Sequence, residues 1–157
     1  MKQVEITTPL SIAKYDELSS IDRHIIDQAR DAALRAYAPY SKFSVGAAVA
    51  LSNGEVITGA NQENVAYPSG TCAERSACFY AHARYPEAKF QAIAIAARGT
   101  DGKEVAHPIS PCGSCRQALL EYEMLAQGNI KVILIGTEEI YILPSIKSLL
   151  PLAFSEF

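Results

Sequence analysis

The chain has 157 residues, of which 49% are hydrophobic and 20% charged, a composition typical of one soluble globular domain. Its net charge of −3 argues against a nucleic-acid polymer as a partner, because neutralising many phosphates requires a face rich in lysine and arginine. The first residues lack the apolar core of a signal peptide and no run reaches membrane-spanning length, so we expect a cytoplasmic protein without a membrane partner. In that reducing setting the four cysteines are expected to bind metal or do chemistry rather than form a disulfide framework.

The first part of the chain predicts an extended arm, an amphipathic helix and a hairpin. These elements are expected, in order, at residues 1–18, 21–38, 44–51 and 56–61. Apolar residues recur at helical spacing from Ile21 onward. Ser19 or Ser20 can cap the start of this helix, and Pro39 limits its end. The two strands flank an Asn-Gly pair, which is preferred in tight hairpin turns where both central residues need positive φ, so they are expected to be antiparallel neighbours.

The rest of the chain alternates loops, helices and strands. After a polar loop at 62–71, we expect a helix from Thr71 or Cys72 to about Arg84, a buried strand at 91–97, a helix at 113–125, a strand at 131–135, an edge strand at 140–143 and a short helix at 145–150. Strand–helix–strand spacing implies parallel pairing with right-handed crossovers. We therefore predict an α/β fold, a three-layer α/β/α sandwich with a mixed five-stranded sheet. No linker divides the chain, so residues 1–157 are expected to form a single domain.

Three cysteines mark the candidate site. Cys72 is followed two residues later by Glu74, and Cys112 and Cys115 form a Cys-x-x-Cys pair preceded by proline. Three thiolates leave the fourth position of a tetrahedral zinc ion open, and an open position that takes water is typical of a catalytic site. Glu74 can handle a proton of that water. We therefore expect about one zinc ion per chain, with Glu74 as the catalytic acid–base group.

Both cysteine motifs fall at predicted helix N-termini, where unpaired amides and the helix dipole favour thiolate over thiol. Arg75 and Arg116 directly follow the motifs. Either they hydrogen-bond the sulfurs and withdraw negative charge from the metal, or they are ordinary surface arginines. A lone Cys-x-x-Cys could equally be redox-active, but its combination with Cys-x-Glu favours zinc.

Other potential ligands have weaker arguments. Cys78 could close the site as a fourth ligand, but its position six residues into the helix after Cys72 predicts that it faces the core. His82 and His107 have no spacing argument for metal binding and are interpreted as structural. His24 is expected to be a surface histidine.

The sequences Cys-Ala-Glu and Pro-Cys-Gly-Ser-Cys-Arg-Gln resemble the motifs of the zinc-dependent cytidine deaminases. Further stretches similar to the short, free-nucleoside branch of this family are residues 40–48, 61–64, 66–68 and 149–154. The resemblance implies hydrolysis of cytidine and 2′-deoxycytidine to uridine and 2′-deoxyuridine with release of ammonia, in pyrimidine salvage. It also implies a homotetramer whose sites are shared between subunits.

The resemblance further implies roles for single residues. Glu74 would carry a proton from the zinc-activated water to N3 of the base and then to the leaving amino group. Asn61 and Glu63 would hold the ribose hydroxyls, and Phe43 would stack on the base. The amide of Ala73 would donate to the pyrimidine carbonyl.

Contacts at the edge of the site are implied as well. The carbonyl of Ser110 would accept from the leaving amine, and Ala66 would be a further substrate contact. Tyr67 and Phe154 would reach into a neighbouring subunit's pocket. Val65 stands where many relatives carry alanine, which leaves the sugar preference open.

Three alternatives share parts of this pattern. A nucleic-acid or tRNA deaminase would usually show a histidine as first ligand and a basic face. A deaminase of an antibiotic nucleoside such as blasticidin S would lack the Asn-x-Glu-Asn motif found at 61–64. A non-catalytic, zinc-stabilised scaffold has no use for an acid such as Glu74 beside an open metal position.

Overall fold

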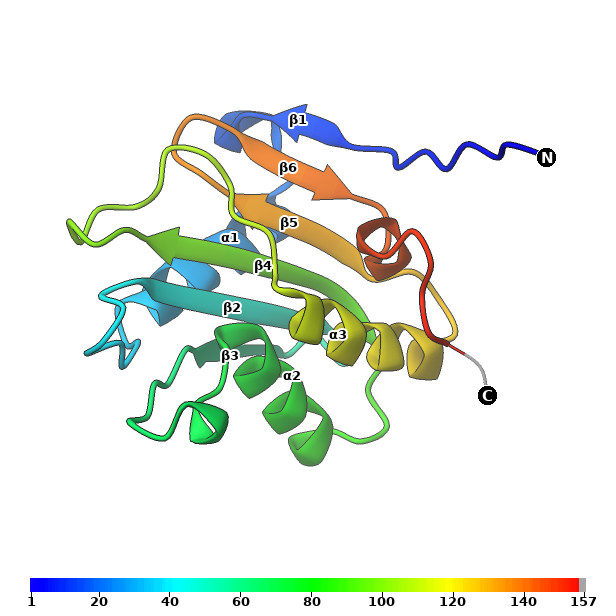
Figure 1. Ribbon diagram of the computed structural model, residues 1–157. Helices are drawn as coiled ribbons and strands as arrows, with labels where there is room; N and C mark the ends of the chain where they lie inside the picture. Colours follow the sequence, from blue (N-terminus) through cyan, green and yellow to red (C-terminus); the bar gives the residue numbers. More distant parts are fainter. Residues whose placement is uncertain (156–157) are drawn as a thin grey trace.

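The computed structural model describes residues 1–155, and within them the strands form one mixed sheet (Figure 1). The strands are β1 (Ser11–Ala13), β2 (Ser44–Leu51), β3 (Val56–Ala60), β4 (Phe90–Arg98), β5 (Lys131–Ile135) and β6 (Ile140–Leu143). The helices are α1 (Ser20–Ala33), α2 (Ala73–Arg84) and α3 (Gly113–Ala126), with short 3-10 turns η1 (Tyr15–Glu17), η2 (Tyr67–Ser69) and η3 (Ile146–Leu149). The strand order is β1-β6-β5-β4-β2-β3, in which β4 and β5 are parallel and the other neighbours antiparallel.

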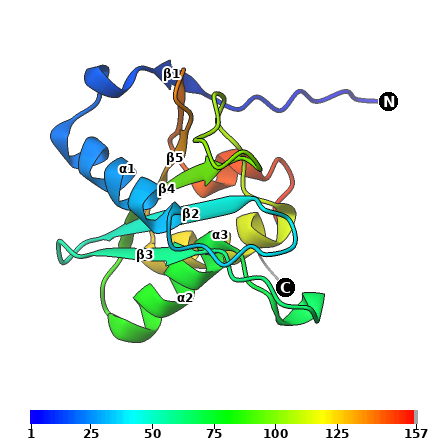
Figure 2. The ribbon, with the colours of Figure 1, turned by 90° about the vertical axis from the view of Figure 1, so that its left-hand side faces the viewer.

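The predicted three-layer sandwich is confirmed, but its sheet has six strands within residues 1–155 instead of the expected five. The additional strand is β1, which pairs with β6 so that Ser11 lies opposite Ile142 and Ala13 opposite Ile140. β6 is therefore an inner strand rather than the edge strand that the sequence predicts. A strand of three residues carries too short a pattern to be recognised, and its partner lies far away in the sequence. Residues 1–10 lead away from this edge as extended chain (Figures 1 and 2).

Helix α1 covers one face of the sheet, whereas α2 and α3 cover the other (Figures 1 and 2). Strand β4 shows how the sequence separates the two layers. Its successive side chains point to opposite faces. Ala92, Ala94 and Ala96 pack in the cluster under α1, while Ile93 and Ile95 pack in the cluster under α2 and α3. The small alanines let α1 lie close to the sheet.

One glycine brings α2 against the sheet. A Cβ atom added at Gly59 of β3 would overlap the main-chain nitrogen of Ala77 and come within 2.6 Å of the carbonyl oxygen of Ala73. Only glycine therefore allows α2 to lie at this distance from β3. Because α2 begins directly after Cys72, this close approach also fixes where the first metal-ligand candidate lies.

The hairpin between β2 and β3 is confirmed, but its turn differs from the predicted one. Asn53 is not among the described residues with positive φ, whereas Gly54 has a φ of 87°. Gly54 N donates to Leu51 O at 3.0 Å, and Leu51 N donates to Glu55 O at 2.9 Å. The connection is thus a three-residue loop with its left-handed position at the glycine.

Helix α1 ends at Ala33, earlier than the limit set by Pro39. Tertiary pairing explains the difference. Tyr37 N donates to Asn61 O at 2.9 Å, and Glu63 N donates to Tyr37 O at 2.8 Å. The main chain around Tyr37 is therefore extended rather than helical, and it lies beside the loop that follows β3. Within residues 1–155, no helix combines the length and apolar character that a membrane span requires.

Candidate active site

Three sulfur atoms converge where α2 and α3 begin. Cys72 is the N-cap residue of α2, Cys112 is that of α3, and Cys115 lies in the first turn of α3. Their Sγ atoms all lie within 4.8 Å of one another, the single such cluster in the part of the chain that the structure describes. Around a tetrahedral zinc ion with Zn–S bonds of about 2.3 Å, sulfurs lie about 3.8 Å apart, so the cluster fits zinc after small adjustments.

The ionisation of the thiols depends on their place in the helices. Burial acts to raise the pKa of Cys112, but hydrogen bonds from the amide and side chain of Cys115, the side chain of Cys72 and the amide of Ser114 together outweigh it, and the pKa lies below its ordinary value. The buried Cys115 shows the opposite direction, because burial and the nearby Glu74 raise its pKa. A cation among the sulfurs would offset this penalty, which is a second reason why the site fits a metal.

The predicted exclusions agree with the structure. Cys78 is 1% exposed and packs in the core under α2, and burial raises its pKa strongly, so it stays a thiol. His82 lies beside the ring of Tyr122, with centroids 5.6 Å apart and the ring planes tilted by 54°, and His24 and His107 are exposed. None of these residues belongs to the sulfur cluster found among residues 1–155.

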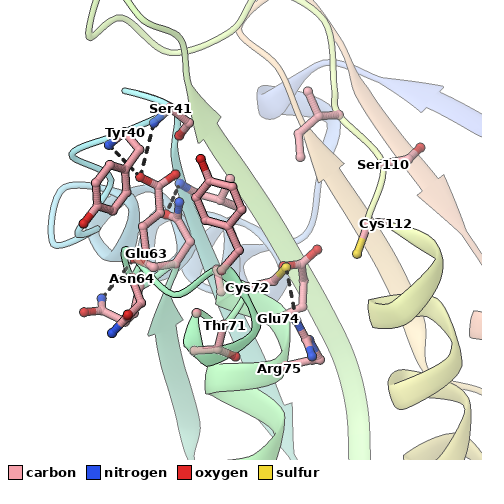
Figure 3. A pocket seen from close by; sticks show the side chains of 17 residues that line it. Tyr40, Ser41, Glu63, Asn64, Thr71, Cys72, Glu74, Arg75, Ser110 and Cys112 are labelled. Atoms are coloured by element: carbon pink, nitrogen blue, oxygen red, sulfur yellow. Dashed lines mark hydrogen bonds between the residues drawn. The ribbon is translucent and has the colours of Figure 1, made fainter.

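Glu74, the second residue of α2, is the buried acid of the site, with 4% of its surface exposed. Burial is the largest influence on it and raises its pKa above the ordinary value. Its own backbone amide, the Cys115 thiol and the charge of Arg75 act in the opposite direction without cancelling that effect. Figure 3 shows Glu74 beside Cys72 at the start of α2. A carboxyl group in this environment accepts a proton more readily than an exposed one, as an acid–base group must.

The two arginines that follow the motifs differ. Arg75 Nη2 lies 3.7 Å from Cys72 Sγ, the dashed contact in Figure 3. Its Nε atom is buried without a hydrogen-bond partner among the described residues. Arg116 instead donates through Nε to Pro111 O at 2.8 Å and through Nη1 to Leu149 O at 2.9 Å. Arg116 thus ties the loop before α3 to the C-terminal segment.

A cavity of about 650 Å³ opens beside the sulfurs, a volume typical of small-molecule sites (Figure 3). Several residues singled out in the sequence line it: Asn61, Glu63, Tyr67, Cys72, Ala73, Glu74, Arg75, Ser110 and Cys112. Lining residues to which the sequence assigned no role include Tyr40, Ser41, Val45, Thr71 and Ile109. Tyr40, Ser41 and Val45 lie within the family-like stretch 40–48, and Thr71 and Ile109 lie directly before Cys72 and Ser110, so their position in the sequence was the available signal.

Three predicted substrate contacts lie outside this lining. Phe43 is half-buried, and its carbonyl oxygen accepts a hydrogen bond from Asn61. Ala66 is exposed at the start of η2. Phe154 is 68% exposed, and its carbonyl oxygen accepts from Gln117 Nε2 at 2.9 Å. Their expected roles therefore stay predictions.

The two candidate sugar ligands are held by the segment that leads into β2. Asn61 Oδ1 accepts from Val45 N at 2.8 Å, and Asn61 Nδ2 donates to Phe43 O at 2.9 Å. Each of these amide atoms retains capacity for one further hydrogen bond. Glu63 Oε2 accepts from Tyr40 N at 2.9 Å and from Ser41 N at 3.2 Å. The Ser41 side chain is the largest influence that lowers the pKa of Glu63, so this carboxylate is ionised at neutral pH.

Comparison with known proteins agrees with this site. A cytidine deaminase of Halalkalibacterium halodurans is 39% identical over 131 residues, which cover 83% of this chain and 92% of the relative. The crystal structure of cytidine deaminase from Burkholderia pseudomallei is similar with a TM-score of 0.72 and 37% identity, covering 87% of this chain and 100% of that one. The corresponding structure from Mycobacterium tuberculosis gives a TM-score of 0.65 and 31% identity over 88% and 99%.

The family match includes both cysteine motifs. Residues 19–127 match the family described as the cytidine and deoxycytidylate deaminase zinc-binding region. The relatives are matched over nearly their whole length, and the similarity therefore extends beyond the metal motifs. The resemblance noted in the sequence is confirmed: the chain belongs to the cytidine and deoxycytidylate deaminase zinc-binding family.

Proposed function

We propose that this chain hydrolyses cytidine and 2′-deoxycytidine to uridine and 2′-deoxyuridine with release of ammonia. The observation that carries the proposal is the position of the buried Glu74 beside three convergent sulfurs, at a cavity of nucleoside size. Zinc, when bound by the three thiolates, supplies a water molecule that ionises near neutral pH. Residues 1–157 form one catalytic domain in this proposal.

Glu74 moves the protons of the reaction. It accepts a proton from the attacking water and delivers it to N3 of the base, while the water oxygen bonds to C4. It then passes the second proton of the water to the amino group, the C4–N bond breaks, and ammonia leaves. One carboxyl group acts first as base and then as acid, which agrees with its buried position and raised pKa.

Main-chain groups orient the base. Ala73 is the first residue of α2, so its amide has no partner within the helix and can donate to the pyrimidine carbonyl oxygen. Ser110 lines the same cavity and offers its carbonyl to the leaving amine. Arg75 donates to the Cys72 sulfur and so draws negative charge from the metal site.

The sugar lies against Asn61 and Glu63 in this proposal, both of which line the cavity. An ionised carboxylate accepts from a sugar hydroxyl, and an amide group both donates and accepts. Phe43 stacks on the base, and Ala66 contacts the substrate. Glu63→Gln should therefore weaken the binding of cytidine far more than the binding of 1-methylcytosine, which has no sugar.

A substrate panel tests the function. The purified protein should convert cytidine and 2′-deoxycytidine with loss of absorbance and one ammonia per uridine formed. Single-stranded DNA and blasticidin S, offered at the same concentration, should remain unchanged. Turnover of either of these alone would assign the site to another class of deaminase, and absence of any turnover by zinc-loaded protein would favour a scaffold.

We also propose that the active unit is a homotetramer with sites completed across subunits. The C-terminal segment 146–154 packs only in part on its own chain. Ile146 and Leu149 are buried, whereas Leu152 is 87% exposed and Phe154 is 68% exposed. Tyr67 at the cavity is 81% exposed. Exposed apolar side chains of this size support the proposal that these two segments contact other subunits.

Deleting residues 152–157 should lower kcat/KM for cytidine by about 10–100-fold, the loss that follows when one phenylalanine side chain no longer packs on its partner. Zinc content should stay at about one per chain, because the deletion leaves the three cysteines in place. Phe154→Ala alone should reproduce most of the loss. A wild-type chain that sediments as a monomer and deaminates cytidine at full rate would contradict the shared-site proposal.

A cytoplasmic role in pyrimidine salvage completes the proposal. The cysteines of the site are free thiols, and zinc binding requires them to stay reduced. Expression of the chain should allow a pyrimidine-requiring strain without its own deaminase to grow on cytidine. Failure of growth despite active protein in the cell extract would contradict this role.

A further inference from the structure

We propose that the turn formed by Tyr40, Ser41 and Lys42 is a positioning device for Glu63, and that the left-handed main chain at Lys42 keeps it in shape. This inference rests on the proposed function, since it concerns the carboxylate assigned to the sugar. Lys42 is a positioning residue in this account, because it acts through Glu63.

The main chain of the turn makes two hydrogen bonds to Glu63, in addition to the effect of the Ser41 side chain on its pKa. Two consecutive amides, those of Tyr40 and Ser41, donate to the same oxygen, Glu63 Oε2 (Figure 3). Consecutive amides that converge on one oxygen are a recurrent way in which a turn binds an anion. They occupy both lone pairs of Oε2, which leaves Oε1 to accept a sugar hydroxyl.

The turn is closed at both ends. Lys42 N donates to Ala38 O at 3.1 Å, and Phe43 N donates to the hydroxyl oxygen of Ser41 at 3.0 Å. Strand β2 follows directly. The main-chain groups of Phe43 and Val45, which follow the turn, form hydrogen bonds with the Asn61 side chain. Both candidate sugar ligands are therefore held by one stretch of chain.

The main chain at Lys42 requires an explanation. Its φ is 57°, and Gln127 is the other non-glycine residue with positive φ within residues 1–155. Gln127 is the C-cap of α3, a position where left-handed residues commonly end helices. Lys42 ends no α-helix of the structure. A left-handed conformation of a lysine is disfavoured, and such positions persist where the surrounding structure requires them. Here it directs the two preceding amides toward Glu63.

A matched pair of variants separates the main-chain conformation from the lysine charge. Lys42→Gly and Lys42→Ile both remove the charge, but glycine adopts positive φ readily and the β-branched isoleucine does not. Lys42→Ile should raise KM for cytidine by about 10–100-fold, the range expected for one lost hydrogen bond to a charged group, with a much smaller change in kcat. Lys42→Gly should stay within about threefold of wild type.

The sugarless substrate distinguishes positioning from general damage. kcat/KM for 1-methylcytosine should be nearly equal in wild type and in both Lys42 variants. The rise in KM for cytidine in Lys42→Ile should not exceed the rise in Glu63→Gln. Zinc content and the unfolding midpoint show whether Lys42→Ile remains folded. Equal losses for both substrates, or equal losses in the glycine and isoleucine variants, would overturn the proposal.

A second measurement is independent of turnover. The pKa of Glu63, followed by NMR of its carboxyl carbon, should rise toward its ordinary value in Lys42→Ile and stay low in Lys42→Gly. An unchanged pKa in the folded Lys42→Ile variant would overturn the positioning role. Absence of cytidine turnover by wild type would instead reject the proposed function, and the titration would still decide whether the turn holds Glu63.

Discussion

Glu74→Gln should lower kcat for cytidine by about 10²–10⁴-fold, because glutamine keeps the size and polarity of the side chain but cannot accept and return a proton. The sulfur cluster is unchanged in this variant, so zinc content should match that of wild type. KM, or the dissociation constant of a nonreactive nucleoside, should change little. Steady-state kinetics together with elemental analysis measure all three quantities.

The chain offers a matched control for this substitution. Glu123 is also a buried carboxylate, but it accepts from Ile130 N, Ser145 Oγ and Ile146 N, away from the sulfur cluster. Glu123→Gln should lower the free energy of unfolding and leave kcat per folded chain close to wild type. Turnover by Glu74→Gln within a few-fold of wild type would mean that another group acts as the base.

Cys72→Ala should remove both zinc and activity. The two remaining thiolates leave an incomplete site, and protein zinc sites almost always keep at least three protein ligands. Zinc content should fall from about one per chain to near zero after dialysis, and cytidine turnover should fall with it. Elemental analysis and the deamination assay on the same sample provide the test.

Cys78→Ala is the matched control for the loss of a thiol from α2. Its sulfur is buried in the core and outside the metal cluster, so the variant should keep zinc and activity and lose only some packing. If Cys78→Ala also lost zinc, or if Cys72→Ala kept it, the ligand set proposed for the site would be wrong.

The metal site could be predicted from sequence because its chemistry is local. A cysteine two residues before an acid and a Cys-x-x-Cys pair each lie within one helical turn. The structure places Cys72 and Cys112 at the helix N-caps that the sequence predicts. The burial of Glu74 follows from the same helix start. Short-range pattern and local chemistry therefore predict this part of the molecule.

Features that depend on contacts between distant segments could not be predicted from sequence patterns. The pairing of Ser11–Ala13 with β6 and the contact of Tyr37 with the chain after β3 join stretches whose own patterns are weak. The sequence left Arg116 open between a donor to the sulfurs and an ordinary surface arginine, whereas its guanidinium donates to the carbonyl of Leu149, a partner 33 residues away. Local spacing cannot show which long side chain meets which distant carbonyl.

The contacts of Glu63 show the same limit at the sugar side of the cavity. The motif drew attention to this residue, but the donors are main-chain amides of Tyr40 and Ser41, more than twenty positions earlier in the chain. Main-chain donors leave no signature in side-chain identity. The left-handed conformation of Lys42, on which the proposed positioning role is based, is likewise visible only in the structure.

Turnover of cytidine in water enriched in ¹⁸O tests the central claim most directly. If water attacks C4 of the ring and ammonia leaves, the uridine formed by the zinc-loaded protein should carry ¹⁸O at that position in the same proportion as the water does. Mass spectrometry of the product, with ammonia measured in the same sample, gives the result. Uridine without the heavy oxygen, or ammonia released without uridine, would contradict hydrolytic deamination at this site.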